Sequence, residues 1–186
     1  MDPIPHILLL GVLAVAVVTD IRGQKIPNLL TFPAMLLAFS YHAMTRGPDG
    51  ILFSLAGFAL GLGVMFVPYL AGVMGAGDVK LMAAVGAFLG VSGTLNAFLL
   101  TSIFGGVYAL IVLMTHFSTL KTVLRALWDS LNVFILAKRF VYVPHRDKHL
   151  PRLCYGVAIA AGTIASMAAD TGLFPAGNLL SPLWPV

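Results

Sequence analysis

The sequence predicts an all-α integral membrane protein with six transmembrane helices and both termini on the external side. Composition is the first observation: of 186 residues, 59% are hydrophobic and only 10% are charged, and the mean hydropathy is +0.97. Soluble domains carry about 25% charged residues, so this inventory cannot cover a water-facing surface. The second observation is that the apolar residues form long runs, and the third is that the basic residues gather between certain runs.

Six apolar runs approach the length of about 20 residues that one helical crossing needs. They cover residues 4–19, 29–44, 51–72, 79–90, 95–115 and 153–169. The fourth run is short: about 12 residues at about 1.5 Å each cover only part of a hydrocarbon core of roughly 30 Å. It is either a tilted span or a re-entrant piece. A single helix over 79–115 would be about 55 Å long and would contain Gly90 and Gly93, so two separate segments are expected.

The basic residues set the orientation. With the amino terminus outside, the inner segments are 20–28, 73–80 and 116–152, and they hold ten of the eleven Lys and Arg residues. Only Arg46 remains outside. Positively charged loops stay on the cytoplasmic side, so this arrangement is favoured, whereas five spans would invert the most basic loop. The first run lacks the basic start of a secretory signal and is interpreted as a retained helix. We therefore expect a multi-pass protein of the cytoplasmic (inner) membrane.

The whole chain, 1–186, is expected to form one membrane domain whose core covers about 4–115. Residues 116–152 carry apolar residues at near-helical spacing among basic ones, which predicts an amphipathic helix lying in the cytoplasmic interface against anionic headgroups. Residues 153–169 form the last helix, and 170–186 form an external tail. The lipid bilayer is thus an expected partner and nucleic acid is not, while the oligomeric state is left open. The single cysteine, Cys154, excludes an internal disulfide and a multi-thiolate metal site, and no metal or cofactor is expected.

Two aspartates directly adjoin apolar helices on the predicted inner side. Asp20 ends the first helix, and Asp78 begins the fourth. Ionisable groups at such positions are costly and functional when they face the interior of a bundle. Taken singly, each has a plainer interpretation. Asp20 could be a boundary charge paired with Arg22 or Lys25, and Asp78 could be an N-terminal charge that the helix dipole favours.

The segment GAGDVK, residues 75–80, sets Asp78 apart from an ordinary boundary charge. Gly75 and Gly77 permit backbone angles and close approaches that other residues do not, so an extended segment could run beside Asp78. Lys80 by itself is interpreted as an interface residue that reaches toward headgroups. A charge that only marks a boundary requires no such glycines. We therefore interpret Asp78 and Asp20 as a pair.

A pair of neighbouring carboxylates can catalyse hydrolysis by general acid–base catalysis. The two cannot both ionise easily, so they share one proton. One carboxylate can then take a proton from water while the other donates to a carbonyl oxygen, which hydrolyses an amide without a metal or a covalent intermediate. The sequence contains no metal-ligand cluster and no G-x-S-x-G motif, and Cys154 is interpreted as a packing residue. The G-x-x-x-G spacings at Gly57 and at Gly86 are interpreted as helix-packing contacts.

These segments resemble a known family, the type IV prepilin peptidases, which are the A24 membrane aspartic proteases. GAGDVKLMAAVGAFLG (75–90) is similar to the family's GxGD segment. TDIRGQKIPN (19–28) is similar to the segment around the family's first catalytic aspartate, and LCYGVAIAAG (153–162) to its last helix. The firm similarity covers roughly residues 8–112, with both motifs in order on one predicted face of the membrane.

The resemblance implies that Asp20 and Asp78 are the catalytic pair, and that Gly75, Gly77 and Lys80 support them. It implies an intramembrane aspartic endopeptidase that cuts the basic leader peptide from a prepilin-type substrate at the cytoplasmic face.

Larger members carry an amino-terminal four-cysteine metal site linked to N-methylation of the trimmed pilin. This sequence has only Cys154, so methyltransferase activity is expected to be absent. The short form resembles the peptidases of tight-adherence (Flp) pili. The alternatives are an archaeal-type preflagellin peptidase, a scaffold subunit of pilus assembly, or a proton-coupled transporter or channel subunit that uses the same aspartates. Transporters of many folds show inverted repeats, and no second copy of the aspartate-bearing segment is visible.

Overall fold

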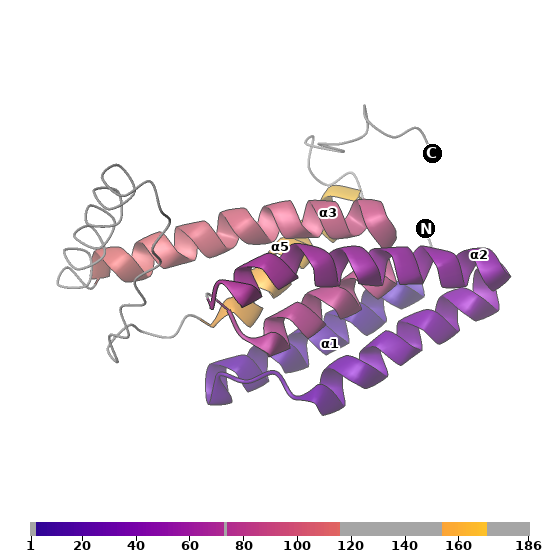
Figure 1. The fold of residues 1–186 in the computed structure, drawn as a ribbon, viewed down its shortest axis with the longest axis horizontal. Helices are drawn as coiled ribbons and strands as arrows, with labels where there is room; N and C mark the ends of the chain where they lie inside the picture. The colour runs from indigo at the N-terminus through magenta and orange to yellow at the C-terminus, as the bar shows by residue number, and fades with distance from the viewer. Residues whose placement is uncertain (1–2, 73, 116–153, 171–186) are drawn as a thin grey trace, which may run out of the picture. The chain divides into compact units, whose positions relative to one another are not determined.

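The computed structural model describes residues 3–72, 74–115 and 154–170, and the regular elements of this part of the chain are α-helices. Their order is α1 (Pro3–Gly23), α2 (Asn28–Leu70), α3 (Ala76–Thr115) and α5 (Tyr155–Asp170) (Figure 1). The described residues up to Gly105, together with those from Cys154 onward, form one compact unit, and residues 106–115 belong to a second. The all-α prediction is confirmed for these residues. The predicted interfacial helix in 116–152 and the tail beyond Asp170 lie outside them.

Three of the helices, α1, α2 and α3, are long and apolar enough to cross a membrane, and α5 is a shorter apolar helix. Many large apolar side chains are exposed on the helices, among them Leu29 at 86% and Met44 at 87%. Such a surface suits contact with lipid, because apolar side chains that face lipid do not have to be buried inside the protein. The chain is therefore a membrane protein. The six crossings and the external position of both termini stay predictions.

Helix α2 covers the second and third predicted apolar runs, 29–44 and 51–72, and the break between its two helical stretches falls at Gly47, in the interval between those runs. A straight helix of 43 residues would be about 65 Å long, but Gly47 interrupts α2 with φ 61° and ψ −139°. This left-handed region is open to glycine. Pro48 then starts the next helical stretch, where its fixed φ and missing N–H cost nothing. We call residues 28–46 the first arm of α2 and residues 48–70 its second arm.

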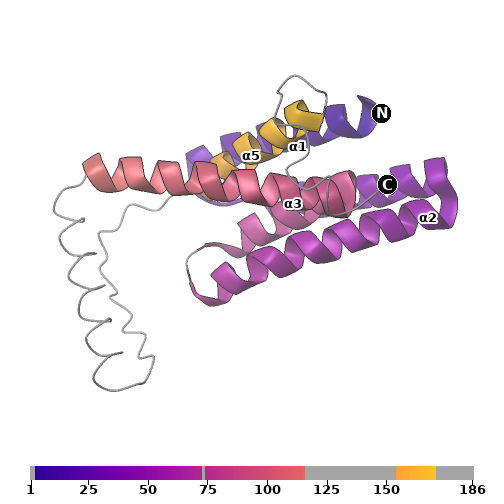
Figure 2. The ribbon, with the colours of Figure 1, turned by 90° about the horizontal axis from the view of Figure 1, so that it is seen from above.

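The two arms of α2 lie side by side. Figures 1 and 2 show α2 turning back on itself, and the rings of Phe39 and Phe58, one from each arm, have centroids 5.9 Å apart. A Cβ atom at Gly50 would collide with the backbone carbonyl of His42, which shows how closely the arms approach beside the turn.

Helix α3 is interrupted in the same way, at Gly90, where φ is 68° and ψ is −169°. We call residues 76–89 the first arm of α3 and residues 91–115 its second arm. The break falls where the sequence predicted the boundary between two segments, although helical residues continue directly after it. A side chain at Gly90 would also strike the ring of Phe53, so this position is restricted by backbone angle and by space.

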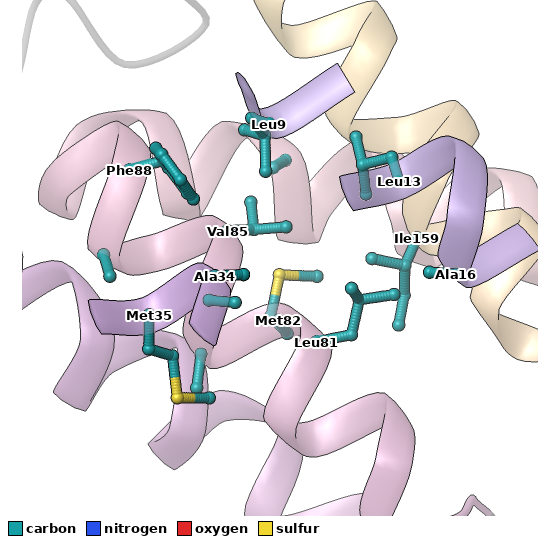
Figure 3. Packing of buried hydrophobic residues seen from close by; sticks show 14 of the residues in the cluster. Leu9, Leu13, Ala16, Ala34, Met35, Leu81, Met82, Val85, Phe88 and Ile159 are labelled. Carbon is teal, nitrogen blue, oxygen red and sulfur yellow. The ribbon is translucent and has the colours of Figure 1, made fainter. Parts of the chain in front are cut away.

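The first arm of α3 is the centre of the bundle. Every residue from Leu81 to Phe88 is buried. Figure 3 shows side chains of α1, α2 and α5, among them Leu13, Met35 and Ile159, gathered around this arm. The alanines and glycine of this stretch let neighbouring helices approach closely, as small residues do in membrane bundles. The run whose length made it doubtful as a span is therefore the most enclosed part of the described chain.

The second arm of α2 packs directly against this central arm. A Cβ atom at Gly57 would collide with the carbonyl oxygen of Gly86, and one at Gly61 would collide with the carbonyl oxygen of Met82. Main chains this close leave no room for side chains. The interpretation of these G-x-x-x-G glycines as helix-packing contacts is confirmed.

Polar side chains of α2 hold the far end of the central arm. Because Gly90 interrupts the helical ladder, the preceding carbonyl groups need donors from elsewhere. The hydroxyl of Ser54 donates to the carbonyl oxygen of Ala87 at 2.9 Å, and Nε2 of His42 lies 3.1 Å from the carbonyl oxygen of Phe88. A carbonyl oxygen only accepts, so Nε2 of His42 carries the proton in this bond. These bonds fix the position of the arm that carries Asp78 at its opposite end.

Candidate active site

One cleft of the structure contains both predicted aspartates. Its volume is about 540 Å³, which falls within the roughly 300–1,000 Å³ typical of small-molecule sites. It lies where the end of α1, the α1–α2 connection and the start of α3 meet. The lining residues are Thr19, Asp20, Gln24, Lys25, Ile26, Pro27, Asn28, Gly75, Ala76, Gly77 and Asp78. The aspartates are 58 positions apart in the sequence, so the fold brings them to one site.

Asp20 is hydrogen-bonded to the start of the last described helix, α5. The side chain is only 5% exposed, and its Oδ2 atom accepts a hydrogen bond of 2.9 Å from the backbone N–H of Gly156. Gly156 is the second residue of α5, where backbone N–H groups have no partner inside their own helix. A buried carboxylate therefore satisfies a free donor at a helix N-terminus, an arrangement that the helix dipole favours.

Asp78 is held by the start of its own helix. Its Oδ2 atom accepts a hydrogen bond of 3.1 Å from the N–H of Gly75, while its own N–H donates to the carbonyl oxygen of Gly75 at 3.2 Å. This is half of a capping box, in which a side chain in the first turn reaches back to the residue before the helix. Asp78 is partly exposed to the cleft, unlike Asp20. Both carboxyl groups border the same cleft.

The α1–α2 connection forms one wall of the cleft. Gln24 directly follows α1 and has a left-handed φ of 49°, and its N–H donates to the carbonyl oxygen of Asp20 at 2.8 Å. The chain then runs without helical structure to Pro27. A Cβ atom at Gly77 would lie 3.1 Å from Cβ of Ile26 in this segment, which is tighter than ordinary contact. A non-helical segment thus passes beside the start of α3, as the glycines of GAGD led us to expect.

Gly75 does not have the unusual backbone angles that the sequence suggested. Neither Gly75 nor Gly77 has a left-handed φ angle; the nearest glycine that does is Gly72, at 72°. A Cβ atom at Gly75 would lie 3.5 Å from Oδ2 of Asp78, an ordinary van der Waals distance. The expectation of unusual backbone angles at this pair was wrong because the turn into α3 is made earlier in the chain. Only the close approach at Gly77 depends on glycine.

Lys80 connects α3 to the start of α2. Its Nζ atom donates to Oδ1 of Asn28 at 2.8 Å and lies 5.3 Å from the ring centroid of Phe32. Because Asn28 follows the α1–α2 connection directly, this contact closes the connection over the start of α3. The lysine therefore has two partners within the protein, Asn28 and Phe32.

Replacing Lys80 with methionine is expected to destabilise the protein by about 1 kcal/mol, because a charge-assisted hydrogen bond and a cation–π contact are lost at a partly exposed site. The melting temperature in detergent measures this loss. In the Asn28→Ala background the same substitution should cost clearly less, since the hydrogen bond is already gone. Fully additive losses would show that the Lys80–Asn28 bond does not contribute to stability.

Cys154 lies next to the aspartates but lacks the properties of a nucleophile. Its thiol donates a weak hydrogen bond to the carbonyl oxygen of Asp20, with the sulfur 3.8 Å from that oxygen. The carboxyl groups of Asp20 and Asp78 are its charged neighbours, and a further negative charge on the sulfur beside them is unfavourable. Because a thiolate rather than a thiol attacks carbonyl groups, this environment opposes nucleophilic catalysis.

Sequence reasoning singled out Asp20, Asp78, Gly77 and Lys80, all of which lie at this cleft or directly beside it. It missed Gly156. That residue stood inside the string similar to the family's last helix, but no local pattern distinguished it from the other small residues of α5. A contact across 136 positions in the chain has no local signature. Among the described residues, no group of three or more His, Cys, Asp or Glu side chains could hold a metal ion.

Comparisons with known proteins identify the family of the chain. Residues 7–110 match the model of the type IV leader peptidase family. The chain is 36% identical over 94 residues to a prepilin leader peptidase/N-methyltransferase of Vibrio cholerae, an alignment that covers 46% of this chain and 36% of the relative. It is 32% identical over 118 residues to a protein of the same name from Bacillus subtilis, covering 62% of this chain and 47% of the relative.

The chain thus spans less than half of the length of these two curated relatives. No solved structure matches the chain significantly. The family match nevertheless covers more than half of the 186 residues and includes both aspartates of the cleft. This protein belongs to the type IV leader peptidase family.

Proposed function

We propose that this protein is an intramembrane aspartic endopeptidase that removes the basic leader peptide from prepilin-like precursors at the cytoplasmic face of the inner membrane. The observation that carries the proposal is the meeting of Asp20 and Asp78 at one cleft, each held by a backbone N–H group. The family match supports the same reaction, since both relatives are named as prepilin leader peptidases.

In the proposed mechanism the two carboxylates share one proton. The ionised one takes a proton from a water molecule, whose oxygen attacks the carbonyl carbon of the scissile amide. The protonated one gives its proton to the carbonyl oxygen, so a neutral diol forms. The first carboxylate, now protonated, then donates to the leaving nitrogen while the other takes back a hydroxyl proton, and the C–N bond breaks. Every proton moves between the substrate, the water and this pair, so the pair returns to its starting state.

The substrate is proposed from the position of the cleft. If the basic loops lie inside, the cleft opens at the cytoplasmic end of the helices, because Lys25 lines it and Arg22 lies one turn before. A prepilin presents its cut site at that level, with the basic leader in the cytoplasm and the apolar helix in the membrane. Gly75, Gly77 and Lys80 then have supporting roles: they hold the start of α3 and the α1–α2 connection around the cleft.

The experiment uses the full chain, purified in detergent, with a synthetic peptide that joins a basic leader to an apolar pilin helix. Mass spectrometry should show two fragments separated by one cut between leader and helix. EDTA should leave the rate unchanged, because carboxylates supply every proton transfer. An intact peptide, or a rate that collapses with EDTA and returns with added metal, would contradict the proposal. A matched peptide with a preflagellin leader distinguishes the archaeal-type alternative.

The orientation, with six crossings and both termini outside, is a separate proposal with its own test. In a Cys154→Ser background, single cysteines are introduced at Lys25, beside the cleft, and at Asp49, just beyond the turn of α2. An impermeant thiol reagent added to whole cells should label position 49 and leave position 25 unlabelled until the cells are opened. The opposite pattern would place the cleft on the external side, and the substrate proposal would fall with it.

A further inference from the structure

Gly156 touches Asp20 in a way that sets it apart from Gly162, the other glycine of α5. Its N–H group donates to Oδ2 of Asp20 at 2.9 Å, although the two residues are 136 positions apart. Figure 2 shows α5 running alongside α1, so that the start of α5 reaches the end of α1. The donor is free because it belongs to the first turn of its helix, where Cys154 precedes the helix and accepts from Val157 at 3.3 Å.

The nearest neighbours of a side chain placed at Gly156 would be atoms of Asp20. A Cβ atom at Gly156 would lie 2.9 Å from Oδ2, 3.2 Å from Cγ and 3.3 Å from Cβ of Asp20, and these are its three nearest neighbours. The contrast with Gly162 on the same helix is informative, since a Cβ atom there would collide with the main chain of Thr101. A side chain at position 162 would push two helices apart. A side chain at position 156 would press first on the side chain of Asp20.

We propose that Gly156 is a positioning residue for Asp20, so that the N-terminus of the last described helix completes the catalytic site. Two properties carry the role: the N–H group that fixes one carboxylate oxygen, and the missing side chain that lets the carboxylate approach that N–H group. With Oδ2 fixed, proton transfer is left to the other oxygen of Asp20. This inference rests on the proposed peptidase function.

The kinetic test is Gly156→Ala in the purified full chain, assayed on the leader–helix peptide. The added methyl group displaces the Asp20 carboxylate without blocking the cleft, so kcat should fall about tenfold or more while KM stays within about twofold. Gly156→Val should lower kcat further. Gly11→Ala and Gly63→Ala are matched controls, because a Cβ atom at either position meets nothing within 4 Å, and both should keep the wild-type kcat. A wild-type kcat in Gly156→Ala would overturn the proposal.

A second measurement does not depend on activity. Alanine stabilises a helix relative to glycine, so Gly156→Ala should raise the melting temperature when Asp20 has been replaced by alanine. With Asp20 present, the same substitution should lower it, because the methyl group and the carboxylate compete for one space. The same shift in both backgrounds would overturn the contact and the positioning role with it.

The two measurements also separate this inference from the function on which it rests. If the wild-type chain leaves the peptide intact while the stability shift reverses between backgrounds, the peptidase proposal fails and the Gly156–Asp20 contact stands. If the wild-type chain cleaves and Gly156→Ala cleaves equally fast, the positioning role fails and the peptidase proposal stands.

Discussion

Asp20→Asn and Asp78→Asn are each expected to abolish cleavage of the leader–helix peptide, with kcat lowered by about 10³-fold or more. Asparagine has nearly the shape of aspartate, and its carbonyl oxygen can still accept the N–H bonds from Gly156 and Gly75. It can neither take a proton from water nor give one to a carbonyl oxygen. The measurement is the single-turnover rate, with the melting temperature showing that each variant is folded.

Asp49→Asn is the matched control for these substitutions. Asp49 is an exposed aspartate just beyond the turn of α2 and outside the cleft, so its loss should leave the rate unchanged. The variant with both Asp20 and Asp78 replaced should be no slower than either single variant. The two carboxylates act as one catalytic unit, so removing one of them already removes the rate enhancement of the pair. Cleavage that survives one of the single substitutions would remove that residue from the catalytic pair.

Gly57→Leu is expected to have the largest effect on folding, destabilising the protein by at least about 3 kcal/mol. A Cβ atom at this position already collides with the carbonyl of Gly86 and lies 2.7 Å from Cα of Gly90, and both obstacles are main-chain atoms. A leucine would have to push the second arm of α2 off the central arm of α3. The amount of folded protein in the membrane and the melting temperature in detergent should both fall.

Gly63→Leu tests whether this effect is specific to the packed face. Gly63 lies six positions further along the same arm, and a Cβ atom there meets nothing within 4 Å. Both substitutions replace a glycine with leucine in the same helix, so both raise the helix propensity by the same amount. Only the packing around the new side chain differs. Equal melting temperatures for the two variants would contradict the close packing of α2 against α3.

The sequence by itself determined the parts of this protein that depend on local composition. Long apolar runs are enough to predict membrane helices, because each backbone polar group in lipid must find its partner within the helix. The segment GAGDVK and the segment ending in Asn28 were recognisable because their residues are adjacent in the chain. The helix-packing role of Gly57 and Gly86 followed from spacing alone. For the same reason, both aspartates could be named before any coordinates were known.

Tertiary structure alone decided which residues meet. Local patterns placed an interruption between residues 44 and 51, but only the structure shows that Gly47 makes it and that the two arms of α2 then pack against each other. Packing made the short run after Asp78 the buried centre of the bundle. It also placed the N–H of Gly156 against Asp20 and the amine of Lys80 against Asn28. Composition determines whether a segment enters the membrane as a helix, but a contact between distant residues depends on how whole helices fit together, and that fit is not encoded in the segment around either residue.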